Sequence, residues 1–291
     1  MFSGSIVAII TPFVAGEQVD YVALERLIEL HVRSGTTGIV IGGTTGESAT
    51  LTSSEHAQLI HRSVELIDGR MHLIAGTGSN STAQTIALSR AADIDGVDGF
   101  LLVAPYYNKP PQRGLIAHFE AIADAVSKPI MLYNVPGRTV SDLSADSVAQ
   151  LAAHENIVAI KDATGDLDRL AEHQTVCPDD FRYFSGDDFT GCEFMLRGGH
   201  GVVSVTANVA PLLMSQMCEL AIAGKRKQAQ VIDARLAALN EAMFSESNPI
   251  PVKWALSELG YGDGSIRSPL VTLDTDRQDD VVTALKNADL M

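Results

Sequence analysis

The feature that most constrains the fold is a repeated unit, a short apolar run followed by an amphipathic stretch. In the first unit, the run 6–10 precedes an amphipathic stretch from Asp20, a suitable helix N-cap, to Gly35, a helix stop. Strands that alternate with helices pair in parallel, and eight such units in 291 residues predict an α/β fold, a closed (β/α)8 TIM barrel. A doubly wound open sheet is the alternative. The other seven apolar runs are 38–41, 72–75, 99–103, 129–133, 157–161, 181–185 and 201–205.

Three further helical patterns follow the eighth unit without strands between them, at 225–243, 249–260 and 279–290. We therefore predict a barrel over residues 1–224 and a C-terminal helical extension over residues 225–291. The extension either packs on the barrel and on a neighbouring subunit, or merely covers the barrel. The helices of the units are expected to begin near Ser53 or Ser54, near Ser81, across 115–126, and at Ser144, Asp166, Asp188 and Pro211.

Charge and composition narrow the class of protein. The chain has 21 Lys+Arg against 36 Asp+Glu, a formal net charge of −15, so its field repels nucleic acid and anionic membranes. An anionic substrate must then be held by local positive groups. No apolar run is long enough to span a bilayer, and the first predicted strand begins too early to leave room for a signal peptide. Three cysteines without C-x-x-C spacing fit a reducing cytosol, with neither disulfides nor a zinc site.

One lysine stands where a buried strand leaves the core. Residues 157–160 read as a continuous buried strand, and Lys161 follows at its end. Burial lowers the pKa of an amine, so this lysine can be neutral and attack a carbonyl to form a Schiff base. The alternative is a side chain whose stem lies on the core while its ammonium group reaches water.

In a barrel, the loops at the carboxyl ends of the strands carry the chemistry. The glycine-rich run 42–48 offers backbone amides and the Thr44 and Thr45 hydroxyls to an anion, and a plain turn is the alternative. The next such loop, 76–80, is better read as a turn. Tyr133 at a strand tip, with Arg138 just beyond it, can serve proton transfer and carboxylate binding. The histidines do not gather at strand ends, which argues against a metal-dependent enzyme.

Together these segments resemble the 4-hydroxy-tetrahydrodipicolinate synthase (dihydrodipicolinate synthase) family, (β/α)8 barrels of the class I pyruvate-dependent aldolases. The resemblance runs essentially from end to end, and the order and spacing of the motifs make it specific. The motifs are Gly43-Thr-Thr-Gly-Glu47, Tyr133-Asn-Val-Pro-Gly-Arg-Thr139, Ile160-Lys-Asp-Ala-Thr164, Gly198-Gly-His-Gly-Val-Val-Ser-Val205 and Asn248-Pro-Ile-Pro-Val-Lys-Trp254.

The resemblance implies a lyase without a cofactor or metal. Its Lys161 forms a Schiff base with pyruvate, and the derived enamine attacks L-aspartate 4-semialdehyde to give 4-hydroxy-tetrahydrodipicolinate, the committed step of lysine and diaminopimelate biosynthesis. It also implies a homotetramer built from two tight dimers. The implied proton relay joins Tyr133, Thr44 and a partner subunit's Tyr107, and the implied substrate-binding residues are Thr45, Arg138, Gly186 and Val203.

The family also commonly has a lysine feedback site. Ser48, Ala49, His56, Asn80 and Tyr106 match it, whereas Ser53 and Gln84 replace the histidine and glutamate of strongly regulated members. Because an amide removes a charged partner for the effector's amine, we expect L-lysine to be a weak effector or none.

Two other functions are compatible with the same residues. Sibling lyases, N-acetylneuraminate lyase and 2-keto-3-deoxygluconate aldolase, use the same lysine and tyrosine with polyhydroxylated acceptors, which have less use for Arg138. A non-catalytic barrel could instead bind a metabolite as a sensor, although binding alone does not need a tyrosine beside an amine.

Overall fold

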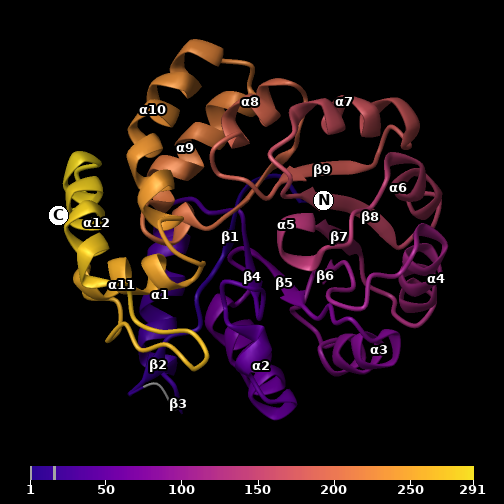
Figure 1. Ribbon diagram of the computed structural model, residues 1–291, viewed down its shortest axis with the longest axis horizontal. Helices are drawn as coiled ribbons and strands as arrows, with labels where there is room; N and C mark the ends of the chain where they lie inside the picture. The colour runs from indigo at the N-terminus through magenta and orange to yellow at the C-terminus, as the bar shows by residue number, and fades with distance from the viewer. Residues whose placement is uncertain (1, 16–17) are drawn as a thin grey trace.

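The computed structural model describes residues 2–15 and 18–291. Within this part of the chain, eight parallel strands close into a barrel in the order β1-β10-β9-β8-β7-β6-β5-β4, which confirms the predicted TIM barrel (Figure 1). A short antiparallel hairpin, β2 (Phe13–Val14) with β3 (Gln18–Val19), was not predicted. The barrel strands are β1 (Gly4–Ala8), β4 (Gly38–Ile41), β5 (His72–Gly76), β6 (Gly99–Val103), β7 (Ile130–Asn134), β8 (Ile157–Asp162), β9 (Arg182–Ser185) and β10 (Gly201–Ser204).

The helices that follow the strands form a ring around the barrel (Figure 1). They are α1 (Tyr21–Arg33), α2 (Ser53–Ile67), α3 (Thr82–Ala91), α4 (Gln112–Ala123), α6 (Ala145–Leu151), α7 (Leu167–Val176), α8 (Gly191–Leu196) and α9 (Pro211–Ile222).

Side-chain caps explain where several of these helices begin. The Asp20 carboxylate accepts from the backbone amides of Val22 and Ala23, and Ser81, Ser144 and Asp166 also cap their helices with side-chain oxygens. The prediction that a helix starts at Asp188 is wrong, since α8 begins at Gly191. The Asp188 carboxylate accepts instead from the amides of Val205 and Thr206, across the barrel end.

Apolar side chains fill both faces of the barrel sheet, as expected for parallel strands covered by helices. Inside the barrel, side chains such as Ile6, Val40, Met131 and Phe184 form one buried cluster. The outward side chains pack against the surrounding helices in a larger cluster that extends to the C-terminal helices. The carboxyl ends of the strands therefore sit on a rigid base.

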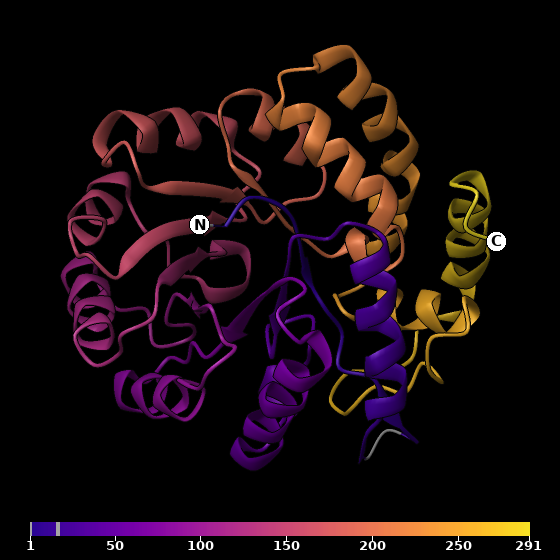
Figure 2. The ribbon, with the colours of Figure 1, turned by 180° about the vertical axis from the view of Figure 1, so that it is seen from behind.

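The C-terminal helices α10 (Arg226–Met243), α11 (Ile250–Glu258) and α12 (Thr275–Asn287) lie outside the ring, beside α9 and α1 (Figures 1 and 2). The last helix starts four residues earlier than the predicted 279, at an Asp274 cap. We propose residues 225–291 as an extension of the barrel domain at 1–224. None of the helices in the described part of the chain is long and apolar enough to cross a membrane.

Candidate active site

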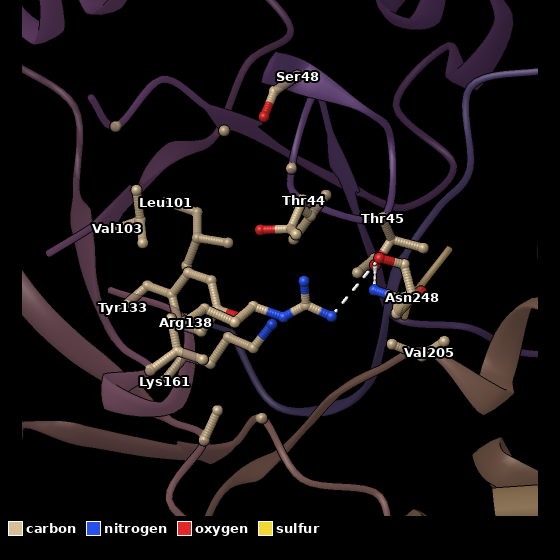
Figure 3. A pocket seen from close by; sticks show the side chains of 18 of the residues that line it. Thr44, Thr45, Ser48, Leu101, Val103, Tyr133, Arg138, Lys161, Val205 and Asn248 are labelled. Carbon is tan, nitrogen blue, oxygen red and sulfur yellow. Dashed lines mark hydrogen bonds between the residues drawn. The ribbon is translucent and has the colours of Figure 1, made fainter. Parts of the chain in front are cut away.

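A cavity of about 220 Å³ lies at the carboxyl end of the barrel, where the sequence predicted the chemistry. Of the predicted catalytic and substrate-binding residues, Thr44, Thr45, Tyr133, Arg138, Lys161 and Gly186 line it. Figure 3 shows the side chains of Lys161, Tyr133 and Arg138 lying together, with the Thr44 hydroxyl facing the same space.

Lys161 enters the cavity from β8 and is only 5% exposed, so the alternative in which its ammonium group reaches water is wrong. Burial lowers the pKa of Lys161 to about 8, with Asp188 opposing this shift and Arg138 adding to it. A substantial fraction of this amine is therefore neutral near physiological pH, as a nucleophile requires.

Tyr133 comes from the neighbouring strand β7, where it pairs directly with Lys161. The Lys161 Nζ atom lies 4.1 Å from the centre of the Tyr133 ring. Burial raises the pKa of Tyr133, against the effects of Arg138 and of a hydrogen bond with Thr44. The phenol thus keeps its proton at neutral pH and can pass it along a hydrogen bond.

The backbone of Gly186 packs against the Lys161 side chain. A Cβ atom at position 186 would lie 2.6 Å from Lys161 Cε, so the backbone can pass this close only as glycine. Val203, also predicted to contact substrate, is fully buried inside the barrel and does not line the cavity, whereas Val205 does. The prediction for Val203 therefore has no support from the side-chain placement.

Thr44 and Thr45 come from the loop after β4, and Arg138 comes from a single helical turn, α5 (Pro136–Thr139), after β7. Asn248 connects Thr45 with Arg138. Its Nδ2 atom donates to Thr45 Oγ1 at 3.0 Å, and its backbone oxygen accepts a weak hydrogen bond from Arg138 Nη2 at 3.5 Å (Figure 3). The C-terminal segment thus contributes directly to the wall of the cavity.

A polar network braces the strand ends beside the lysine. Asn134 Nδ2 donates to Asp142 at 2.8 Å and to Asp162 at 3.2 Å, and Arg169 forms a two-pronged ion pair with Asp142. Asp162 is 6% exposed and also lies 3.3 Å from Arg169 Nε. Because Asp162 follows Lys161 directly, this network restrains the backbone that carries the amine.

Tyr107 does not line the cavity of its own chain. It is 87% exposed, and its backbone adopts a left-handed φ of 74°. Its amide donates to the Thr139 carbonyl at 3.3 Å, next to Arg138. The expected contribution of Tyr107 to a partner's site stays a prediction.

A second cavity, of about 530 Å³, adjoins the first. Ser48, Ala49, His56 and Tyr106, four of the five residues predicted for a lysine site, line it together with Ser53 and Gln84. Asn80 is not among the lining residues, but its Nδ2 donates to the Tyr106 carbonyl at 3.1 Å.

Several cavity residues escaped the sequence reasoning. Asn248, Asp187 and Phe244 line the cavity, and the ring of Phe244 lies 5.6 Å from that of Phe189. Asn248 and Phe244 belong to the C-terminal segment, and no local pattern indicates that this segment folds back over the barrel mouth. Asp187 follows the strand that ends at Ser185, and this position could have identified it as a cavity residue.

The described residues contain no group of three or more His, Cys, Asp or Glu side chains placed to hold a metal ion.

A buried amine with a lowered pKa, a phenol at its side and a guanidinium at the rim of a (β/α)8 barrel together define a Schiff-base-forming enzyme of the class I aldolase type. Comparison with known proteins agrees, since the model of the dihydrodipicolinate synthetase family matches residues 1–288. The chain belongs to this family.

Individual relatives cover the whole chain. The 4-hydroxy-tetrahydrodipicolinate synthase of Pseudoalteromonas atlantica is 49% identical, over 100% of both chains. The chloride-inhibited dihydrodipicolinate synthase of Acinetobacter baumannii, solved with pyruvate, superposes with a TM-score of 0.98 at 48% identity, over 100% of both chains. The enzyme of Cyanidioschyzon merolae, solved with lysine bound, has a TM-score of 0.96 at 40% identity, over 100% of this chain and 99% of that one.

Proposed function

We propose that this enzyme condenses pyruvate with L-aspartate 4-semialdehyde to form 4-hydroxy-tetrahydrodipicolinate, the committed step of lysine and diaminopimelate biosynthesis. The observation that carries the proposal is the buried Lys161 amine beside Tyr133, within a cavity rimmed by Arg138. Membership of the dihydrodipicolinate synthetase family and the pyruvate complex of the Acinetobacter baumannii relative support the choice of substrates.

The reaction begins when the neutral Lys161 amine attacks the keto carbon of pyruvate and water leaves, giving an iminium ion. Loss of a methyl proton converts this ion into an enamine, whose terminal carbon attacks the aldehyde of the second substrate. The substrate's own amine then attacks the iminium carbon, closes the ring and releases Lys161 unchanged. One water is lost overall, and no external electron acceptor is needed.

Tyr133 is positioned to carry the protons of these steps, since its ring centre lies 4.1 Å from Lys161 Nζ and its hydroxyl hydrogen-bonds with Thr44. We assign Tyr107 of a partner subunit as the third member of this relay. Its 87% exposure and its place beside the Arg138 turn are consistent with reaching across a subunit boundary.

Carboxylates on both substrates need positive or donor groups, because the chain as a whole carries −15. Arg138 supplies the guanidinium for the semialdehyde carboxylate, and Thr45 supplies a donor for pyruvate. Gly186 allows pyruvate to approach the amine, and we retain Val203 only as a backbone contact.

The proposal includes a cytoplasmic homotetramer made of two tight dimers, as the family resemblance implies. It also includes weak feedback by L-lysine at the second cavity. The lysine complex of the Cyanidioschyzon merolae relative supports such a site, and the neutral Ser53 and Gln84 side chains at this cavity support weak binding.

The deciding experiment is a steady-state assay of pyruvate with L-aspartate 4-semialdehyde, coupled to dihydrodipicolinate reductase and read as NADPH loss. We expect robust turnover, together with a borohydride-stable pyruvate adduct on Lys161. An adduct without turnover, with the coupling enzyme active, would point to a sibling lyase acting on sugar acids. An unmodified Lys161 peptide would favour a sensor.

A further inference from the structure

The loop that carries Thr44 and Thr45, residues 42–50, contains Glu47, which does not line the cavity around Lys161 and whose side chain is buried against the C-terminal extension. Glu47 is 3% exposed, and its backbone is left-handed, with a φ of 55°. Such a conformation is strained for a residue other than glycine and needs support from its surroundings. Within the loop, the Glu47 amide donates to the Thr44 carbonyl at 3.1 Å, and the Glu47 carbonyl accepts from the Thr50 amide at 3.0 Å and from Thr50 Oγ1 at 3.1 Å. These bonds hold the backbone of the turn but not the Glu47 side chain.

The Glu47 side chain is held by the C-terminal extension. The Nζ atom of Lys253, on α11, forms a short ion pair with Glu47 Oε1, and the two side chains are 2% and 1% exposed. The backbone amide of Arg267 donates to the other carboxylate oxygen, Glu47 Oε2, at 3.0 Å. Both oxygens of this buried carboxylate are therefore held by residues more than two hundred positions further along the chain.

Two flanking contacts extend the attachment. The Arg267 guanidinium donates to the Thr50 carbonyl at 2.8 Å and pairs with Glu55 at 2.6 Å, which fixes the far end of the loop on α2. The Lys253 ammonium and the Arg267 guanidinium lie 4.1 and 4.3 Å from the ring centre of Phe13. Aromatic faces of this kind stabilise cations that have lost water.

We propose that Glu47 and Lys253 are positioning residues for catalysis: their buried ion pair holds the loop 42–50 so that the Thr44 and Thr45 hydroxyls face the reacting atoms. The inference rests on the proposed function for the roles of these hydroxyls. It gives the extension a part in the active site, in place of the reading in which the extra helices merely cover the barrel.

A buried ion pair is a costly way to gain stability alone, because two apolar side chains of similar size often serve as well or better. What the ion pair adds is a defined orientation of the Glu47 side chain. Two carboxylate oxygens with separate donors fix both the position and the rotation of Glu47, three residues from Thr44. A displacement of about 1 Å in a positioned group can reduce a rate by about a hundredfold.

The test compares Lys253→Met, Glu47→Met/Lys253→Met and the conservative Lys253→Arg with the wild type. Arg235→Gln is the matched control, because it breaks an exposed ion pair with Asp289 within the same extension. The readouts are kcat and the KM for pyruvate, the rate of borohydride trapping on Lys161, thermal stability, and amide hydrogen exchange of residues 43–50.

We expect Lys253→Met to lower kcat/KM for pyruvate ten- to a hundredfold and to lower thermal stability, because it leaves a buried carboxylate unpaired. The double variant has no unpaired charge, so it should regain stability while kcat/KM stays low and exchange in 43–50 stays fast. Lys253→Arg should recover part of the activity, and Arg235→Gln should match the wild type.

The proposal would be overturned if the double variant regained wild-type kcat/KM together with its stability. It would also be overturned if amide hydrogen exchange of residues 43–50 in Lys253→Met and in the double variant matched that of the wild type. Pyruvate trapping by the wild type reports separately on the proposed function. Because hydrogen exchange reads the loop whatever the reaction is, failure of one proposal is distinguishable from failure of the other.

Discussion

Lys161 and Tyr133 are direct partners in the pairing of β8 with β7, and the lysine nitrogen lies 4.1 Å from the tyrosine ring centre. Parallel pairing thus places a nucleophile beside a proton carrier without a flexible loop between them. Strands hold functional groups more precisely than loops do. The chemistry of this enzyme accordingly depends on the register of two strands, and the surrounding loops supply the substrate contacts.

The pKa of Lys161 predicts how imine formation depends on pH. Burial lowers this pKa to about 8, so the amine gains its neutral form as pH rises through 8. At subsaturating pyruvate, the rate of borohydride trapping on Lys161 should rise about tenfold per pH unit below pH 7 and flatten above pH 8 to 9. A rate that keeps rising to pH 10 would show an amine with an ordinary pKa.

The same burial implies a stability penalty at the active site. The folded-state pKa of Lys161, about 8, lies below the unfolded value of 10.5, so stability declines as pH falls from about 10.5 to 8 and the full penalty remains below that. This shift corresponds to about 3 kcal/mol. We expect Lys161→Met to raise the free energy of unfolding at pH 7 by about 1–3 kcal/mol in urea titrations. The exposed Lys286→Met should change it by less than about 0.5 kcal/mol, and an equal gain in both variants would contradict the prediction.

Arg138 should discriminate the acceptor aldehyde. Replacement by alanine removes a charge-assisted contact with the carboxylate of L-aspartate 4-semialdehyde, so kcat/KM for this substrate should fall about ten- to a hundredfold. Pyruvate trapping should change much less. Arg197→Ala, which breaks an exposed pair with Glu193, serves as the control. Unchanged turnover in Arg138→Ala would remove this residue from the acceptor site.

Tyr107 can be tested by mixing two inactive variants. If each site takes Tyr107 from a partner subunit, co-refolded Tyr107→Ala and Lys161→Met chains should recover activity, because each mixed pair contains one intact site. Equal mixing would restore roughly a quarter of the sites. No recovery above the separate variants, with mixed oligomers shown by mass spectrometry, would place Tyr107 outside the partner's site.

The second cavity predicts weak feedback. L-lysine should inhibit the wild type only partially or at high concentration, because Ser53 and Gln84 present no charge to its amine. The double substitution Ser53→His/Gln84→Glu should tighten inhibition by up to about a hundredfold, equivalent to a few kcal/mol at most. Glutamate can also keep the bond that Gln84 Oε1 accepts from Ser79 Oγ at 3.0 Å. Complete inhibition of the wild type at a low L-lysine concentration would contradict the prediction of weak feedback.

Local chemistry made much of the fold predictable. Apolar runs bounded by Asp20, Ser144 and Asp166 caps indicated strands and helices to within a few residues. The prediction of a helix start at Asp188 was wrong because a carboxylate before an apolar stretch resembles a helix cap. Its actual partners, the amides of Val205 and Thr206, lie at the end of another strand. A helix start can be read locally only when the cap bonds its own helix.

The sequence by itself determined the barrel, through the period of its apolar residues, and the position of Lys161 at the end of a buried strand. Tertiary structure alone decided that the amine is buried to 5% exposure, and that Asn248, Lys253 and Arg267 return to hold the Thr44–Thr45 loop. The reason is physical. Strand and helix propensities act between near neighbours, whereas desolvation and the Glu47–Lys253 contact depend on segments that meet only after the chain has closed on itself.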